Sequence, residues 1–163
     1  MLFRSKSPIT ASGTSVDFSS IPSWVSRISI MFNGLSTAST GTLMLQVGNS
    51  GGIVATGYVG TVGAFSSSST SSVIASGTAG FWLTTAGASA ATSSYNGLAT
   101  LMRVDDAGTI WSLTGDITYT TAGSSAYFAG SVTGLSSILT TVRITTTAGT
   151  DTFDAGTINI IYE

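Results

Sequence analysis

Short runs in which apolar and polar residues alternate recur from one end of the chain to the other. In residues 24–32, the apolar side chains of Ile28, Ile30 and Phe32 fall on every second position. Because successive side chains of a strand point to opposite faces, this spacing predicts a strand with one buried face. No window of the sequence shows the wider apolar stripe of an amphipathic helix. The chain is therefore expected to be all-β.

The other runs are rich in β-branched and aromatic residues and are bounded by Gly, Asn, Asp or Ser. The expected strands are residues 14–18, 24–32, 42–47, 53–58, 80–85, 97–104, 109–114, 127–132, 138–146 and 157–162. Two stretches are expected to be loops, the serine tract 66–72 and the alanine-rich residues 86–94. The residues Asp-Asp-Ala-Gly at 105–108 predict a tight hairpin, because Asp and Gly tolerate positive φ.

These spacings are typical of a sandwich or barrel. The sequence predicts a single antiparallel, jelly-roll-like β-sandwich of about ten strands over residues 13–163. Residues 1–12 are expected to form a short irregular arm. The length of 163 residues fits one domain.

Charge is scarce outside the expected core. The chain has 28 Ser, 27 Thr and 20 Gly, but only 5 Lys and Arg and 7 Asp and Glu. Since a monomer is usually kept soluble by scattered surface charge, this composition indicates that much of the exterior faces other protein. A monomeric sandwich kept soluble by its hydroxyl groups is the alternative.

The composition also bears on function. With no His and no Cys, the chain cannot build a Ser-His-Asp triad, a thiol nucleophile or an ordinary zinc site. Residues 48–52 (GNSGG) are similar to the serine loop of trypsin-like proteases but lack a base, so a glycine-rich turn is expected. The carboxylate pairs Asp105/Asp106 and Asp151/Asp154 lie in expected turns, and no calcium loop is recognisable. We expect no enzyme, no cofactor and no metal.

Other partners are disfavoured too. A net charge of −2 argues against nucleic acid, and no apolar run approaches the ~18 residues of a membrane span. The N-terminus lacks the apolar segment of a secretory signal, so synthesis in the cytoplasm is expected.

Aromatic residues are the better functional candidates, because sugar-binding surfaces combine aromatic platforms with short polar side chains. The glycan-binding candidates are Tyr58, Tyr95 and Trp82, of which the two tyrosines lie nearer expected loops. Four others are expected to lie in or against the core, Trp24, Phe32, Phe81 and Trp111. Three arginines in expected strands, Arg27, Arg103 and Arg143, are expected to pair with Asp or to reach a neighbouring subunit.

Three stretches carry a resemblance to known proteins: residues 21–37, residues 45–52 with Tyr58, and residues 153–163. They resemble a β-sandwich domain of tailed-bacteriophage virion proteins, tail-fibre or tail-associated. The resemblance implies a non-enzymatic virion protein, commonly a homotrimer, and brings no catalytic residues with it. It favours a tail or fibre module that binds a host surface glycan. The alternative is a capsid decoration protein whose arm attaches to the shell through Leu2, Phe3, Arg4 and Lys6.

Overall fold

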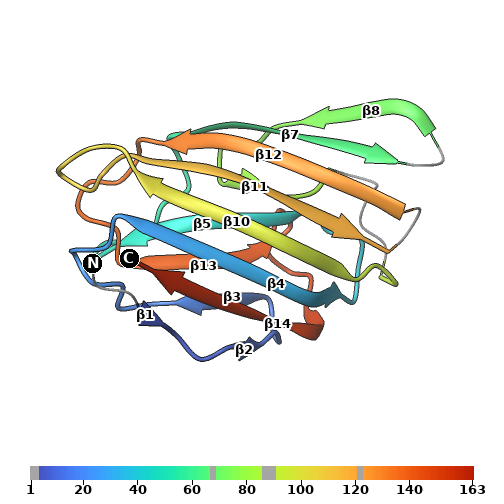
Figure 1. The fold of residues 1–163 in the computed structure, drawn as a ribbon, viewed down its shortest axis with the longest axis horizontal. Coiled ribbons are helices and arrows are strands. Elements are labelled where there is room, and N and C mark those ends of the chain that lie inside the picture. Colours follow the sequence, from blue (N-terminus) through green and yellow to red (C-terminus); the bar gives the residue numbers. More distant parts are fainter. Residues whose placement is uncertain (1–3, 67–68, 86–90, 121–122) are drawn as a thin grey trace.

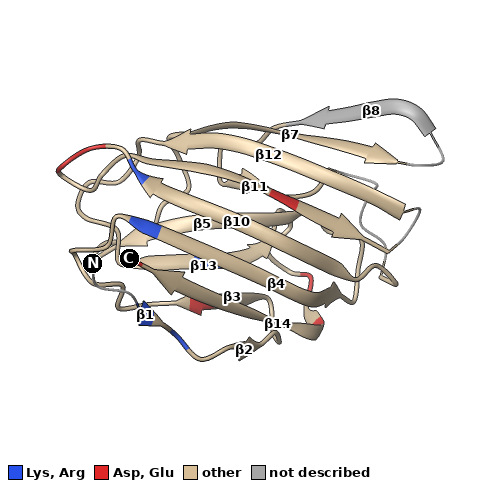
Figure 2. Cartoon of the chain, in the orientation of Figure 1, with Lys and Arg blue, Asp and Glu red and all other residues tan. Residues whose placement is uncertain are grey.

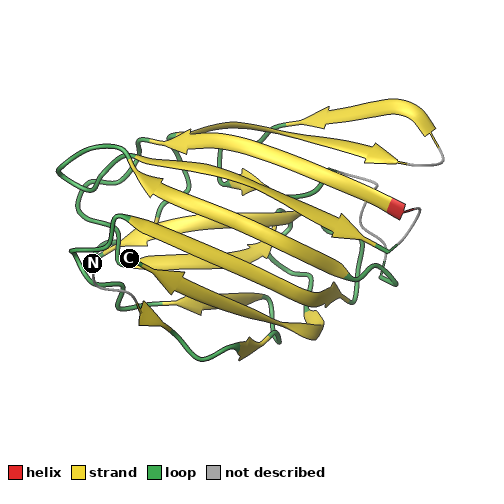
Figure 3. Ribbon diagram, in the orientation of Figure 1, coloured by secondary structure: helices red, strands yellow, loops and turns green. Residues whose placement is uncertain are grey.

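Two antiparallel β-sheets pack face to face and enclose the core (Figures 1 and 3). The computed structural model describes residues 4–66, 69–85, 91–120 and 123–163, with residues 69–75 described by their backbone alone. This part of the chain holds fourteen strands and no α-helix. The expectation of an all-β sandwich is confirmed.

The larger sheet runs in the order β1-β14-β4-β10-β11-β12-β7-β8, with β2 also paired to β14. Its strands are β1 (Arg4–Ser5), β2 (Ile9–Thr10), β4 (Arg27–Thr37), β7 (Tyr58–Ser66), β8 (Ser69–Ala75), β10 (Tyr95–Arg103), β11 (Trp111–Tyr119), β12 (Ser124–Val132) and β14 (Phe153–Tyr162). The smaller sheet runs β3-β13-β5-β6, with β9 also paired to β5. Its strands are β3 (Ser15–Phe18), β5 (Leu43–Asn49), β6 (Gly52–Ile53), β9 (Phe81–Trp82) and β13 (Thr141–Thr146).

The core lies between the two sheets and uses the faces that alternation predicts. Ile28 and Ile30 on β4 are fully buried, as are Leu43, Leu45 and Val47 on β5. Phe32, Phe81 and Trp111 are buried as expected. Trp24 is 38 % exposed before the start of β4, and it lies against the core as expected, with its ring 5.9 Å from the ring of the buried Tyr162.

The hairpin between β10 and β11 forms where Asp105 and Gly108 predict it. The Asp105 carboxylate accepts hydrogen bonds from the amides of Thr109 and Ile110, both at 2.9 Å, and from the Thr109 hydroxyl at 2.7 Å. These bonds, led by that from the Ile110 amide, lower the pKa of Asp105. Gly108 supplies the left-handed conformation, with φ of 72°.

Asp105→Ala is therefore expected to lower the free energy of unfolding at pH 7. Because the pKa of Asp105 is lower in the folded protein than in the unfolded one, its carboxylate stabilises the fold at pH values above the unfolded pKa. This stabilisation is lost as the pH falls through the folded pKa. The difference in free energy of unfolding between wild type and variant should therefore be smaller at acidic pH. Urea titrations at pH 7 and pH 3 measure it, with Asp106→Ala as the neighbouring control. An equal difference in free energy of unfolding at both pH values would contradict this stabilising role of the Asp105 carboxylate.

The sequence misplaces the segment that follows β6. The strand expected over 53–58 is limited to Gly52–Ile53, and β7 begins only at Tyr58. Part of the expected loop 66–72 belongs to β8, which is hydrogen-bonded to β7 at the edge of the sheet. Residues 86–90 of the other expected loop lie outside the described residues.

The N-terminal segment is also more ordered than expected. Residues 4–11 run along β14, where the amide of Lys6 bonds Ile160 O at 3.1 Å and the amide of Ala11 bonds Gly156 O at 3.0 Å. Ala11 is buried. This segment forms the outermost part of the larger sheet instead of an irregular arm.

Candidate functional site

The outer face of the smaller sheet brings together polar side chains from three strands. Strand register places Arg143 of β13 between Asp17 of β3 and Gln46 of β5. One step along the strands, Thr145 of β13 lies between Ser15 of β3 and Met44 of β5. Since side chains two residues apart share a face, both rows point away from the core.

Trp82 extends the second row. Strand β9 pairs with β5 so that Trp82 lies opposite Met44 and Phe81 lies opposite Leu45. Phe81 is therefore buried between the sheets, while Trp82 is half-buried on the outer face. Of the three glycan-binding candidates, Trp82 alone occupies an accessible surface position.

The loop before β9 lies against this face and fixes its shape. Gln46 Nε2 donates a hydrogen bond to Ala79 O at 2.9 Å. The backbone of Gly80 approaches Met44 so closely that a Cβ there would lie 2.6 Å from its Cγ. Gly77 is held equally close to the Trp82 indole. Both glycines are required by close approach, so the loop and Trp82 are packed as one unit.

The guanidinium of Arg143 is held by a two-point ion pair. Its Nε and Nη2 donate to the two carboxylate oxygens of Asp17, each at 2.7 Å. This bonding raises the pKa of Arg143 further above its ordinary value. The pair is about one-third exposed on both sides, so it is a fixed polar surface and contributes little to stability. The expectation that a strand arginine pairs with Asp is confirmed here.

Two adjoining hollows of about 310 and 380 Å³ lie over these rows and share Met44, Ala79 and Thr147. We call them together the small-sheet groove. The groove is lined by Ser15, Met44, Gln46, Trp82, Arg143, Thr145 and the loops at 76–79 and 147–149. Its size suits a small ligand. It offers an aromatic ring beside planar, hydrogen-bonding polar groups.

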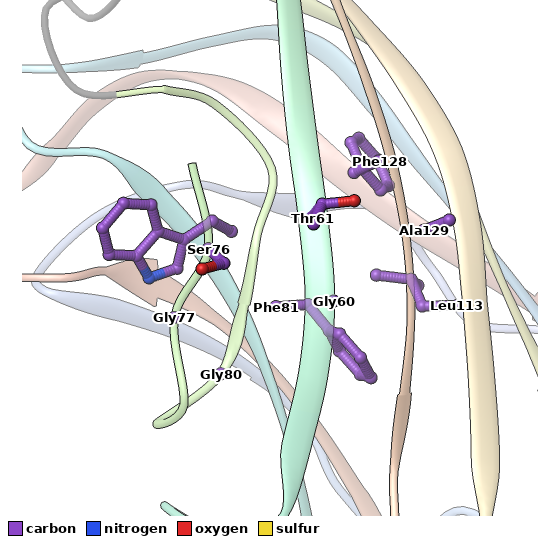
Figure 4. A pocket seen from close by; sticks show the side chains of 10 residues that line it. Gly60, Thr61, Ser76, Gly77, Gly80, Phe81, Leu113, Phe128 and Ala129 are labelled. Carbon is purple, nitrogen blue, oxygen red and sulfur yellow. The ribbon is translucent and has the colours of Figure 1, made fainter. Parts of the chain in front are cut away.

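A third hollow is too small to hold a ligand. About 10 Å³ remains between Phe81, Gly60, Leu113 and Phe128, room for one water at most (Figure 4).

Tyr58 belongs to the core instead of the glycan-binding surface. It is 3 % exposed, and its ring packs edge-on against Phe81 at 4.9 Å. Its hydroxyl accepts a hydrogen bond from Val47 N at 2.9 Å and donates to Val54 O at 3.0 Å. Burial raises the pKa of Tyr58 to about 12. The expectation that Tyr58 lies at the surface is wrong, because its hydroxyl finds backbone partners inside the sandwich.

Tyr95 is also buried, at 0 % exposure, beside the ring of Tyr119. It begins β10 on the face that points to the core. A ring with no exposed surface cannot stack on a sugar, so the surface placement expected for Tyr95 is wrong as well.

The attachment candidates are only partly described. Leu2 and Phe3 lie outside the described residues. Arg4 is exposed on β1, and Lys6 Nζ donates a hydrogen bond to Ser19 O at 2.6 Å. The Lys6 ammonium is therefore used within the chain.

The protease-like GNSGG segment is a turn between β5 and β6, as expected. Asn49 Oδ1 accepts the amide hydrogen of Gly51 at 2.8 Å, and Ser50 Oγ lies 3.4 Å from Ser137 Oγ. Across the described ranges, no group of three or more acidic side chains could hold a metal ion.

The sequence missed Gln46, Asp17 and Met44 as members of the site. Period-two alternation places each of them on the outer face of a strand, but only the strand order brings them together. Tyrosines near expected loops were predicted as site residues instead, although Tyr58 begins a strand with one buried face.

Comparison with protein-family models, with curated proteins and with solved structures finds no match to this chain. Within the described residues, no helix has the length and hydropathy needed to cross a membrane.

Proposed function

We propose that this protein is a non-enzymatic glycan-binding module of a tailed-phage virion, acting as an oligomer at the tail or fibre. The observation that carries glycan binding is the small-sheet groove, in which the hollow lined by Trp82 adjoins the hollow lined by Gln46 and Arg143. The virion setting is supported by the resemblance of residues 21–37, 45–52 and 153–163 to tail-associated domains.

The chemistry of the groove suits a sugar. The apolar face of a pyranose ring stacks on an aromatic face, for which Trp82 and Met44 provide the apolar floor. Neighbouring sugar hydroxyls need donors and acceptors held at fixed angles. Arg143 is immobilised by Asp17, and Gln46 by Ala79 O, so their polar atoms are ordered before a ligand arrives.

A single groove of this size would bind weakly. Repetition of the groove on an oligomer raises avidity by roughly 10²–10⁴ without any new contact. Such avidity suits a protein that must hold a particle to a cell surface.

Trp82→Ala is expected to weaken glycan binding at least tenfold, which corresponds to about 1.4 kcal/mol, because the stacking platform is removed. The measurement is binding of the labelled full-length protein to an array of bacterial surface polysaccharides, followed by titration of the best oligosaccharide. Trp24→Ala is the matched control, since Trp24 is a comparably exposed tryptophan outside the groove. Circular dichroism checks that both variants are folded.

Equal affinities of wild type and Trp82→Ala, or equal losses in both variants, would overturn the groove as the glycan site. Absence of binding to every polysaccharide, together with saturable binding to particles stripped of the protein, would favour the decoration role instead.

A further inference from the structure

Four neighbouring strands of equal length make up much of the outer face of the larger sheet. Strands β10, β11, β12 and β7 each have nine residues and pair without interruption over nine residue pairs. Buried and accessible positions alternate along them, so every second side chain points away from the core. The result is a regular surface with no bulge between β10 and β7.

Exposed apolar side chains gather on this surface. Eight large hydrophobic residues are exposed in the part of the chain with described side chains, and six of them lie here or directly after β10. They are Val59, Phe65, Leu98, Met102, Val104 and Tyr127. The rings of Phe65 and Tyr127 contact each other edge-on at 5.9 Å across neighbouring strands. The six residues form two groups, one on and after β10 and one on β12 and β7, with β11 between them. Exposed apolar side chains concentrated on one face mark an interaction site.

Charge is nearly absent from the same surface. Asp116 is the one charged residue among the outward-facing positions of these four strands. Figure 2 shows a single acidic segment on β11; the other charged segments visible there lie at strand ends, in loops, at the β1 edge and on β3 of the smaller sheet. Register places Asp116 between Leu98 and Tyr127, so one carboxylate lies within the face. A low density of charged residues is typical of protein interfaces.

Large and small side chains alternate across the strands. Tyr127 lies opposite Gly63, Phe65 opposite Ser125, and Val59 opposite Ser131. On the other side of the patch, Met102 lies opposite Ser112. Each of these four side chains thus lies beside a smaller one. Large residues beside small ones allow two sheet faces to interdigitate, as the inner faces of stacked sheets do.

The area is close to that of a stable interface. With β4 included, five strands at a spacing of ~4.8 Å and nine residues at ~3.4 Å each cover roughly 700 Å². Stable protein interfaces bury about 800 Å² on each partner.

We infer that the outer face of the larger sheet is the surface on which a second copy of this chain packs. This inference rests on the oligomeric part of the proposed function and identifies its contact surface. Because the face lies on the opposite side of the sandwich from the small-sheet groove, assembly leaves the groove open.

Val59→Arg tests the inference. Val59 is 73 % exposed on β7 and lies opposite Ser131, so the substitution is expected to leave the fold intact while placing an unpaired charge in the contact. Sedimentation velocity of the full chain from 1 to 200 µM is the measurement. Wild type is expected to assemble, and Val59→Arg to shift the midpoint of assembly at least thirtyfold towards higher concentration.

Thr150→Arg is the control, because it adds the same side chain at an exposed turn away from this face. It should assemble like wild type. Trp82→Ala should also assemble, so failure of glycan binding and failure of assembly are separable. A wild type that is monomeric at 200 µM, or an assembly unaffected by Val59→Arg, would overturn the inference.

Discussion

Replacing Ile30 with Asp is expected to abolish the folded state. Ile30 is 0 % exposed near the middle of β4, where register places it between Ile160 of β14 and Ala99 of β10. No donor is available there to a carboxylate. An isolated buried charge costs more than the ~5–15 kcal/mol of net stability that a domain has. Circular dichroism and limited proteolysis should report an unfolded chain.

Asn33→Asp provides the matched control. Asn33 is exposed on the same strand, and its substitution adds the same carboxylate in water. The control should unfold at nearly the same urea concentration as wild type. A folded, protease-resistant Ile30→Asp protein would mean that the buried face of β4 has been assigned the wrong way round.

Tyr58→Phe is expected to lower the free energy of unfolding by about 1–3 kcal/mol at pH 8. The substitution keeps the ring against Phe81 but leaves the amide of Val47 and the carbonyl of Val54 without the hydroxyl that bonds them. Urea titrations of both proteins measure the difference. Tyr127→Phe, at an exposed ring, should change stability by less than ~0.5 kcal/mol.

The difference in free energy of unfolding between wild type and Tyr58→Phe should become smaller at alkaline pH. Its pKa of about 12 in the folded protein lies above the ordinary value of 10. Because the pKa of Tyr58 is raised in the folded protein, its neutral hydroxyl contributes its full stabilisation at pH values below the unfolded pKa. This contribution is lost as the pH rises through the folded pKa. Wild type should therefore lose up to ~2–3 kcal/mol more than Tyr58→Phe between pH 10 and pH 12. A constant difference between pH 8 and pH 11.5 would contradict the buried position of this hydroxyl.

Much of the fold could be predicted because alternation is strong where one face of a strand is buried. The pattern at Ile28, Ile30 and Phe32 predicts the inner face of β4, and Asp105 with Gly108 predicts the hairpin that follows β10. In both cases the signal is local: it depends on side-chain period or turn chemistry, and no distant partner is needed.

Strand β7 was missed because its support is not local. Gly60 lies directly opposite Gly130 of β12, and two facing glycines weaken the appearance of a strand. The ring of Phe81, from the other sheet, lies over both and fills the space that side chains would take. Strand β8 was missed for the same reason, because this serine-rich segment forms a strand by pairing with β7.

The candidate site was predicted only in part for a similar reason. Trp82 could be predicted because aromatic residues are common in sugar-binding surfaces. The contact between Asp17 and Arg143 could not, because the two residues are 126 positions apart in the sequence. Their contact follows from the pairing of β3 with β13, which alternation cannot specify because it gives faces and not neighbours.

The pairing of β1 with β14 determines how the molecule would respond to a pulling force. The two ends of the chain lie side by side, with Arg4 opposite Tyr162 (Figure 1). A load applied between them would act across the strands and break the hydrogen bonds of β1 and β14 one after another. Strands pulled along their length must break many such bonds at once. The sandwich should therefore yield at low force when held by its two ends, and resist much higher force when neighbouring strands of the larger sheet are pulled along their length in opposite directions.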